Sequence, residues 1–274
     1  MLRKIWKTPQ AVIGLALIVL ICAVAVLAPI LAPHSPDTVN PLLKYQAPSA
    51  DYPLGTDQLG RCELSRLLYG ARASLGLALP ILILLGGIGL ILGMMTACTG
   101  GGFDRIMTGI SQVFIAFPTL IIAVAIIGAL GNGLQNIIWA VVISMWARFM
   151  QLIRTYAKTE LGRVYIIAAR VSGCGIWQLI VHHLIPNILP QFLVYFSTGV
   201  ASAILTVSSF SFLGLGLPSG TAEWGAMLEE ARVALYSHPE LLIYPGICIF
   251  IAAAGFNLFG EALRDILQPQ EDVL

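Results

Sequence analysis

The chain has few charged residues, and none of them falls inside its long apolar runs. Charged side chains make up 11% of the 274 residues and hydrophobic ones 58%, whereas a typical soluble domain is about 25% charged. Six apolar runs, at residues 11–31, 73–97, 106–130, 134–147, 188–213 and 241–260, contain no Asp, Glu, Lys or Arg. This composition excludes a soluble domain, and the lack of ionisable groups disfavours a proton-coupled or ion-coupled carrier.

The sequence also lacks a nucleotide site, a disulfide framework and a metal-ligand pattern. No G-x-x-x-x-G-K-[ST] phosphate loop occurs, so any ATP that drives transport must be hydrolysed on another chain. Of the five cysteines only Cys62 is expected on the outer side, which leaves no pair for an oxidising compartment. No His, Cys or Asp pair has ligand spacing on one helix, so we expect neither a metal site nor a cofactor on this chain.

Each of the apolar runs predicts a membrane-spanning helix, because about 20 residues cross the hydrocarbon core. The fourth run is short, and we expect it to continue to Ile153 with the Arg148 side chain reaching the interface. The first run follows a basic segment like a secretory signal, but its length and the Ala28-Pro29 step favour a retained span. With the N-terminus inside, the inner segments hold ten Lys and Arg residues and the outer segments five, which predicts cytoplasmic termini.

The predicted organisation is an all-α membrane protein with six transmembrane helices. A cytoplasmic tail (1–10) precedes the first helix (11–31) and an external, proline-rich loop (32–72). A five-helix core (73–262) contains a polar inner loop (154–186), and a cytoplasmic tail (263–274) ends the chain. A short outer helix is expected at residues 224–236, with a solvated acidic face.

The inner loop has the period of two short amphipathic helices. Val164, Ile167, Ala168 and Val171 recur at helical spacing, and a second apolar pattern runs from residue 176 to Pro186. Gly173 and Gly175 separate the two and predict a sharp corner. Such a corner could rest on the inner leaflet as a plain connector, or it could dock into a groove on a soluble partner.

Several motifs in this chain resemble those of the nickel, dipeptide and oligopeptide permeases of ABC importers. The inner loop carries the family's Ala168-Ala169, Gly173 and Ile185-Pro186. Segments 54–61, 70–76, 211–216, 223–227 and 256–260 match in order and spacing, so the resemblance covers nearly the whole chain. It implies a type I importer permease fold in which the inner loop is the coupling helix that contacts an ATPase.

The resemblance also implies the site residues. ATPase coupling would fall to Arg163, Ile167, Ala168, Ala169, Arg170, Gly173, Gly175, Ile185 and Pro186, and external partners would be contacted by Asp57, Arg61, Glu223, Trp224, Glu229 and Glu230. Two residues depart from the family pattern: Ile167 stands where a Glu is usual, and Cys62 stands where an Asp is usual.

The predicted function is therefore that of a permease subunit in the bacterial inner membrane, not an enzyme. Its expected partners are a homologous second permease, two ATPase subunits that hold ATP and Mg²⁺, a solute-binding protein and membrane lipid, without nucleic acid. Nickel or a nickel chelate is the first candidate substrate and di- or oligopeptides are the alternative. A channel is the rival of another class, with Gly131-Asn132-Gly133 and Ser208-Ser209 as weak filter candidates.

Overall fold

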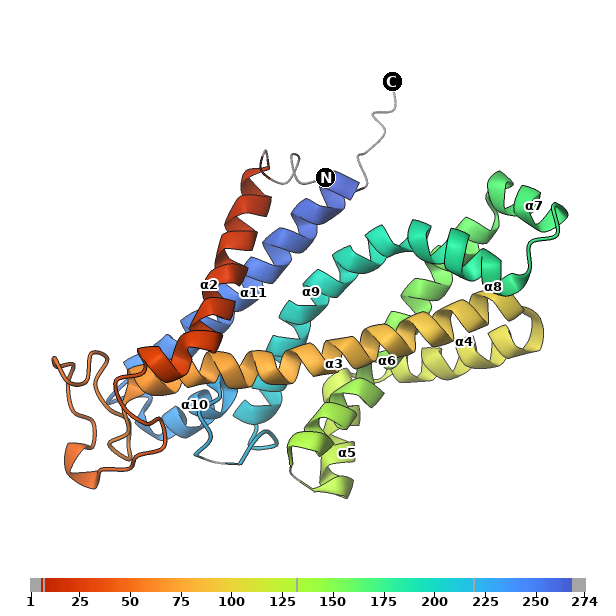
Figure 1. Ribbon diagram of the computed structural model, residues 1–274. Helices are drawn as coiled ribbons and strands as arrows, with labels where there is room; N and C mark the ends of the chain where they lie inside the picture. Colours follow the sequence, from red (N-terminus) through yellow and green to blue (C-terminus); the bar gives the residue numbers. More distant parts are fainter. Residues whose placement is uncertain (1–5, 7, 132, 219, 268–274) are drawn as a thin grey trace.

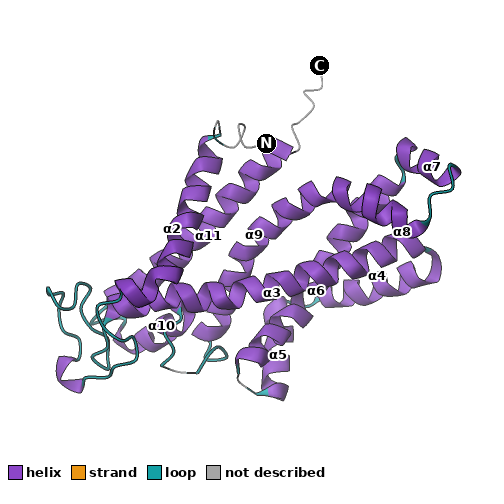
Figure 2. Cartoon of the chain, viewed as in Figure 1, coloured by secondary structure: helices purple, strands orange, loops and turns teal. Residues whose placement is uncertain are grey.

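The computed structural model describes residues 6, 8–131, 133–218 and 220–267, and this part of the chain is almost entirely helical (Figures 1 and 2). The helices are α2 (Pro9–Leu31), η1 (Pro41–Leu43), α3 (Glu63–Thr99), α4 (Gly101–Ala116), α5 (Thr119–Leu130), α6 (Leu134–Leu161), α7 (Val164–Val171), α8 (Ile176–Leu179), η2 (Ile180–Leu184), α9 (Ile185–Phe212), α10 (Trp224–Ala231), η3 (Arg232–Ala234) and α11 (Glu240–Leu267). No strand occurs among the described residues, so the all-α prediction is confirmed.

Five helices are long and apolar enough to cross a membrane, and α4 with α5 makes a sixth span if the bent pair is counted as one. The N-terminal Arg3, Lys4 and Lys7, the loop residue Asn132, and residues 268–274 of the predicted C-terminal tail lie outside the described residues. In Figure 1 the start of α2 and the end of α11 lie on the same side of the molecule.

The third predicted span, residues 106–130, is broken into two helices. α4 and α5 meet at an angle of 91°, where Phe117 and Pro118 have extended backbone conformations (ψ 141° and 127°). A proline disfavours the helical conformation in the residue before it and cannot donate a hydrogen bond to the preceding turn. The span predicted at residues 106–130 is therefore present as two helices that are bent at Pro118.

The other spans extend beyond their apolar runs. α3 begins at Glu63, ten residues before the predicted start at Ala73, so the end of the predicted external loop is helical. α6 continues to Leu161, where Arg154 Nε donates to Asp104 of α4 over 2.5 Å and Lys158 pairs with the same carboxylate. These ion pairs hold the polar end of α6 in helical form.

The greater length of α6 changes the position of Arg148. Fourteen residues of α6 precede Arg148 and thirteen follow it, so it lies near the middle of this helix instead of at its end. The expectation that the Arg148 side chain reaches the membrane interface stays a prediction, because the last turns of α6 are polar and extend beyond the apolar run. No Asp or Glu accompanies it within the run 134–153.

Glycines allow the principal helices to pack closely. A Cβ atom at Gly89 or Gly93 of α3 would lie 2.7 Å from the Cβ of Phe149 or Ile153 of α6. α2 crosses α11 in the same way, because a Cβ at Gly14 would lie 2.6 Å from the Phe259 backbone nitrogen. Gly89 and Gly93 thus form a close helix contact, as small residues do in membrane bundles.

The second half of the inner loop is not a separate helix. α8, the π-helical turn η2 and α9 form one continuous helical run, from Ile176 to Phe212. Pro186 lies in the first turn of α9, and the backbone N–H of Ile185 bonds to the carbonyl oxygen of Ile180. Pro186 has no backbone N–H to donate, and the wider π turn just before it shifts the hydrogen-bond register of the helix at this point. Pro186 therefore does not end the helix, whereas the sequence pattern had suggested that the second short helix stops there.

Candidate functional site

The corner formed by α7 and α8 projects from one end of the bundle, away from the loop that contains η1 (Figure 1). α7 is attached to the body through Ile166, its only buried residue. Ile166 belongs to a hydrophobic cluster drawn from α3, α6, η2 and α9, whose other buried members are Met94, Ala97, Ile153, Ala157, Leu179, Leu184 and Ile188. A short helix is thus fixed rigidly to three long ones by one deeply buried side chain.

The rest of the apolar stripe on α7 faces away from the protein. Val164 is 81% exposed, Ile167 53% and Val171 84%, and Trp177 at the start of α8 is 75% exposed. Burying such side chains is favourable by roughly 1.5–3 kcal/mol each, so this stripe favours contact with either the membrane surface or a partner protein. We call Val164, Ile167, Val171 and Trp177 the corner surface.

The turn between the two helices depends on Gly173. Its φ angle is +86°, and the N–H groups of Gly173 and Cys174 bond to the carbonyls of Arg170 and Ala169, at 3.0 and 3.1 Å. This is the Schellman arrangement that ends a helix with a left-handed residue, usually glycine. Gly175 then begins α8, and its N–H donates to Gln178 Oε1. The predicted glycine corner is present in the structure.

Polar groups around the corner are held mostly by local contacts. Arg163 is exposed and lies 3.7 Å from Glu160, while Arg170 is exposed as well. Tyr165 Oη donates to Glu160 over 2.7 Å, and burial together with this hydrogen bond raises the pKa of Tyr165 to about 12. Two cationic side chains therefore flank the corner surface and are available to an acidic partner.

The structure brings most of the predicted coupling residues together. Arg163 is the N-cap of α7, Ile167, Ala168, Ala169 and Arg170 lie on α7, and Gly173 and Gly175 lie in the turn after it. Ile185 and Pro186 lie on the first turn of α9. Sequence reasoning missed Trp177, because it falls between the apolar positions of the second periodic pattern. Its large apolar side chain beside a glycine corner was the available signal.

At the opposite end, four charged residues form a closed network. Arg61 Nε donates to Asp57 over 2.6 Å, Arg66 Nη1 donates to Asp57 over 3.0 Å, and Arg66 Nη2 lies 3.2 Å from Glu230. Arg61 also bonds to Glu230, which accepts from the Gly220 N–H at 2.7 Å. Two guanidinium groups and two carboxylates thus join the external loop, α3 and α10 with no net charge.

Glu223 and Trp224 are buried beside this network. Glu223 caps α10 by accepting from the N–H groups of Gly225 and Ala226, at 3.0 and 2.9 Å, and it accepts from Ser74 of α3 at 3.0 Å. The indole of Trp224 donates to the Leu67 carbonyl over 3.1 Å. Both side chains hold α10 against α3.

These contacts correct the assignment of external-partner residues. Asp57, Arg61, Glu223 and Trp224 are each at most 4% exposed, so their side chains have no surface to offer a partner. Glu230 is occupied by the network, and the predicted solvated acidic face is therefore largely internal. Only Glu229, which is half-buried, has no place in the network. The charges pair inside because residues 57–66 fold back over α10.

Cys62 occupies the N-cap position of α3 and makes no side-chain capping bond there. Aspartate is a preferred N-cap residue, which gives a physical meaning to the family's usual Asp at this position. Cys62 is instead buried, at 2% exposure. The helix start is fixed by backbone bonds, since the Glu63 N–H donates to the Gly55 carbonyl over 3.1 Å.

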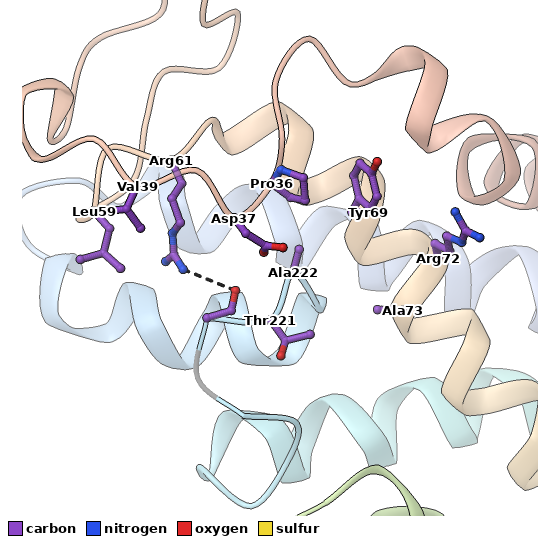
Figure 3. A pocket seen from close by; sticks show the side chains of 11 residues that line it. Pro36, Asp37, Val39, Leu59, Arg61, Tyr69, Arg72, Ala73, Thr221 and Ala222 are labelled. Carbon is purple, nitrogen blue, oxygen red and sulfur yellow. Dashed lines mark hydrogen bonds between the residues drawn. The ribbon is translucent and has the colours of Figure 1, made fainter.

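A hollow of about 640 Å³ lies beside the network at this end of the molecule. Figure 3 shows Pro36 and Asp37 from the external loop opposite Thr221 and Ala222, with Tyr69 and Arg72 on α3 and a dashed hydrogen bond from Arg61 to the Gly220 carbonyl. The walls come from three separate segments that the ion-pair network holds in place.

Long apolar helices, a broken third span and paired termini define the class as a polytopic α-helical membrane protein. The family described as the binding-protein-dependent transport system inner membrane component matches residues 89–272, and the N-terminal transmembrane domain of oligopeptide transport permease C matches residues 1–48. The chain belongs to this family of importer permeases, with the type I permease fold.

Individual relatives cover almost the whole chain. The nickel transport system permease protein NikC of Escherichia coli is 36% identical over 96% of this chain and 94% of its own length. The dipeptide transport system permease protein DppC of Alkalihalophilus pseudofirmus is 34% identical, over 98% and 88%. The metal-staphylopine import system permease protein CntC of Staphylococcus aureus is 35% identical, over 98% and 93%. The family resemblance read from the sequence motifs is thereby confirmed.

Proposed function

We propose that this chain is one of two homologous permease subunits of an ATP-driven importer and that the corner surface is where an ATPase subunit binds. The observation that carries the proposal is an apolar surface left bare at the tip of a short helix whose one buried residue, Ile166, is anchored among three long helices. Separate ATPase subunits would supply ATP and Mg²⁺ binding.

The anchoring explains how force could pass from an ATPase to the membrane helices. The cluster around Ile166 includes Met94 of α3, Ile153 of α6 and Ile188 of α9. Close-packed side chains move together because a packed interior resists compression. A displacement of α7 would therefore be transmitted to α3, α6 and α9 without bending α7 itself.

The proposed orientation places the corner surface and both termini in the cytoplasm and the ion-pair network outside. The Lys and Arg distribution supports this orientation, as does the position of Arg154, Lys158, Arg163 and Arg170 near the corner. A solute-binding protein would then approach the end of the molecule that carries the hollow beside Tyr69 and Arg72.

Nickel or a nickel chelate is the proposed substrate, with di- or oligopeptides as the alternative. The relative NikC carries the word nickel in its name and matches nearly the full chain, whereas DppC at similar identity is a dipeptide permease. Among the described residues no group of three His, Cys, Asp or Glu side chains could hold a metal ion. A nickel substrate would consequently cross this subunit without a cage of protein ligands.

Uptake in a deletion strain tests the substrate. Cells lacking the gene should accumulate less ⁶³Ni from medium that contains a chelator, and should remain sensitive to a toxic dipeptide. Restoring the intact gene should restore nickel uptake. A gene that encodes the Val171→Asp variant should fail to restore it. Dipeptide resistance together with unchanged ⁶³Ni accumulation would assign the chain to the peptide branch, and no change in either would contradict the proposed importer.

A further inference from the structure

A groove runs along the outward face of α9, between this helix, α6 and the break before α5. Two hollows of about 340 and 180 Å³ share Thr119, Leu205 and Thr206 in their walls and form one continuous groove. The first also touches Arg148 of α6, and the second extends to Ser209 of α9. The groove is therefore lined by three spans at the depth where α6 passes its midpoint.

Hydroxyl groups line the α9 side of the groove. Thr198, Ser202, Thr206 and Ser209 follow one another at intervals of three or four residues, which places them on one face of the helix. Ser202, Thr206 and Ser209 each donate to the carbonyl four residues earlier, at 3.3, 2.7 and 2.7 Å. Their oxygens keep free lone pairs, and a hydroxyl can rotate to donate to a solute.

Arg148 is the only charged residue among those that line this groove. Its side chain is exposed, and no described residue makes a hydrogen bond or ion pair with it. An unpaired guanidinium facing hydrocarbon is strongly unfavourable, so an arginine in a groove between helices of the bundle favours a partner subunit or a water-filled space over lipid. The hydroxyls beside it have the same preference, which favours the water-filled space.

We propose that Arg148 and the hydroxyl face of α9 form a binding station for carboxylate groups in the translocation pathway. A guanidinium presents paired N–H donors that match both oxygens of one carboxylate, whereas it repels a bare divalent cation. Resting on the proposed function, this identifies the substrate class as an anionic solute: a metal would pass as its complex with a carboxylate chelator, and a peptide by its C-terminal carboxylate.

Charge-selective labelling of the complete transporter in nanodiscs tests the station without requiring a known substrate. The five native cysteines are replaced, and Ser202 is changed to Cys. The reaction rate of this cysteine is measured with two reagents, the anionic sulfonatoethyl and the cationic trimethylammonioethyl methanethiosulfonate. Each rate is divided by the rate at which the same reagent reacts with the free thiol 2-mercaptoethanol. Charged clefts raise encounter rates by about tenfold or more, so the anionic reagent should be favoured roughly tenfold.

Matched variants separate the effect of the Arg148 charge from that of the electrostatic field of the rest of the transporter. Arg148→Gln should bring the ratio of the two rates near one, Arg148→Lys should preserve it, and Arg105→Gln, which changes an exposed arginine of α4, should leave it unchanged. The preference should weaken when the cysteine is placed at Ser209, about 10 Å farther along α9.

Three outcomes would overturn the station. Equal normalised rates with Arg148 present would mean that an acidic group of the second permease neutralises it. A cysteine at residue 202 that reacts with neither reagent would mean that lipid or protein covers the groove, and an unchanged ratio in Arg148→Gln would locate the attraction elsewhere. Failure of the proposed function has a different signature, because proteoliposomes of the unaltered transporter would then show no ATP-dependent ⁶³Ni or dipeptide uptake whatever the labelling result.

Discussion

Replacing Glu230 by glutamine should destabilise the permease, because Glu230 is one of two carboxylates that neutralise two buried arginines. The side chains of Arg61 and Arg66 are 2% and 1% exposed, and that of Glu230 is 12% exposed. In Glu230→Gln the amide keeps an oxygen for the Gly220 N–H, but Asp57 is then the only carboxylate that is hydrogen-bonded to the two guanidinium groups. Breaking a buried pair in this way costs about 3–5 kcal/mol.

The shift in melting temperature follows from that cost. At about 2–4 °C per kcal/mol for a chain of 150–250 residues, the lower end of the range gives a decrease of roughly 6–12 °C. The assay is thermal unfolding in detergent of a protein in which the other four cysteines are replaced. Unfolding is monitored by the reaction of a fluorogenic maleimide with Cys62, which lies in the same region and is 2% exposed when folded. The label should react at a lower temperature in the variant.

Glu229→Gln is the matched control, since the neighbouring carboxylate lies outside the network. It should melt within 1–2 °C of the unaltered protein, on the order expected for a surface change. Equal shifts in Glu229→Gln and Glu230→Gln would refute the network as a source of stability. A Glu230→Gln variant that melts normally yet loses affinity for a solute-binding protein would restore the external-contact assignment.

Three further predictions concern the inner loop and the topology. In Gly173→Ala the added Cβ meets no atom within 4 Å, but the left-handed backbone should cost about 1–2 kcal/mol of stability and ATP-dependent uptake should fall several-fold. Gly173→Asn should stay near normal, because asparagine tolerates this conformation. Equal uptake by the unaltered protein and both variants would show that the turn is not needed. Ile167→Glu restores the usual residue of the family and keeps the other three apolar side chains of the corner surface, so ATP-dependent uptake should persist. A complete loss would mean that the Ile167 side chain is itself essential for docking. A membrane-impermeant thiol reagent should label Lys44→Cys and miss Ser172→Cys in intact cells, and the reverse pattern would invert the orientation.

The sequence was sufficient for the features that depend on local pattern. The apolar runs located every long helix, and the spacing of Val164, Ile167 and Val171 predicted α7 with the ends that the structure has. Gly173 marked the corner because only a left-handed residue ends a helix so abruptly. These signals lie within a few residues of one another, so no long-range packing is needed to read them.

The features that were missed depend on contacts between distant segments. The pairing of Arg61 with Glu230 joins residues 169 positions apart, and nothing in either local sequence indicates that these charges are buried. Pro118 accounts for a break in the helix, but the size of the turn, 91°, depends on how α4 and α5 each pack against α6. The length of α6 was also missed, because the apolar run ends before Arg148 although the helix continues to Leu161.

The central claim, that the corner surface binds an ATPase, is tested most directly by measuring the affinity of the purified ATPase subunit for the permease in nanodiscs. Trp177 is 75% exposed, and an aromatic anchor at an interface is worth about 2 kcal/mol or more, so Trp177→Ala should weaken binding roughly 30-fold. Trp139→Ala, which removes a 49% exposed tryptophan from α6, should leave the affinity unchanged. Unaltered binding by Trp177→Ala, and by the double variant Trp177→Ala with Val171→Asp, would contradict the account. The corner would then be a connector lying on the membrane.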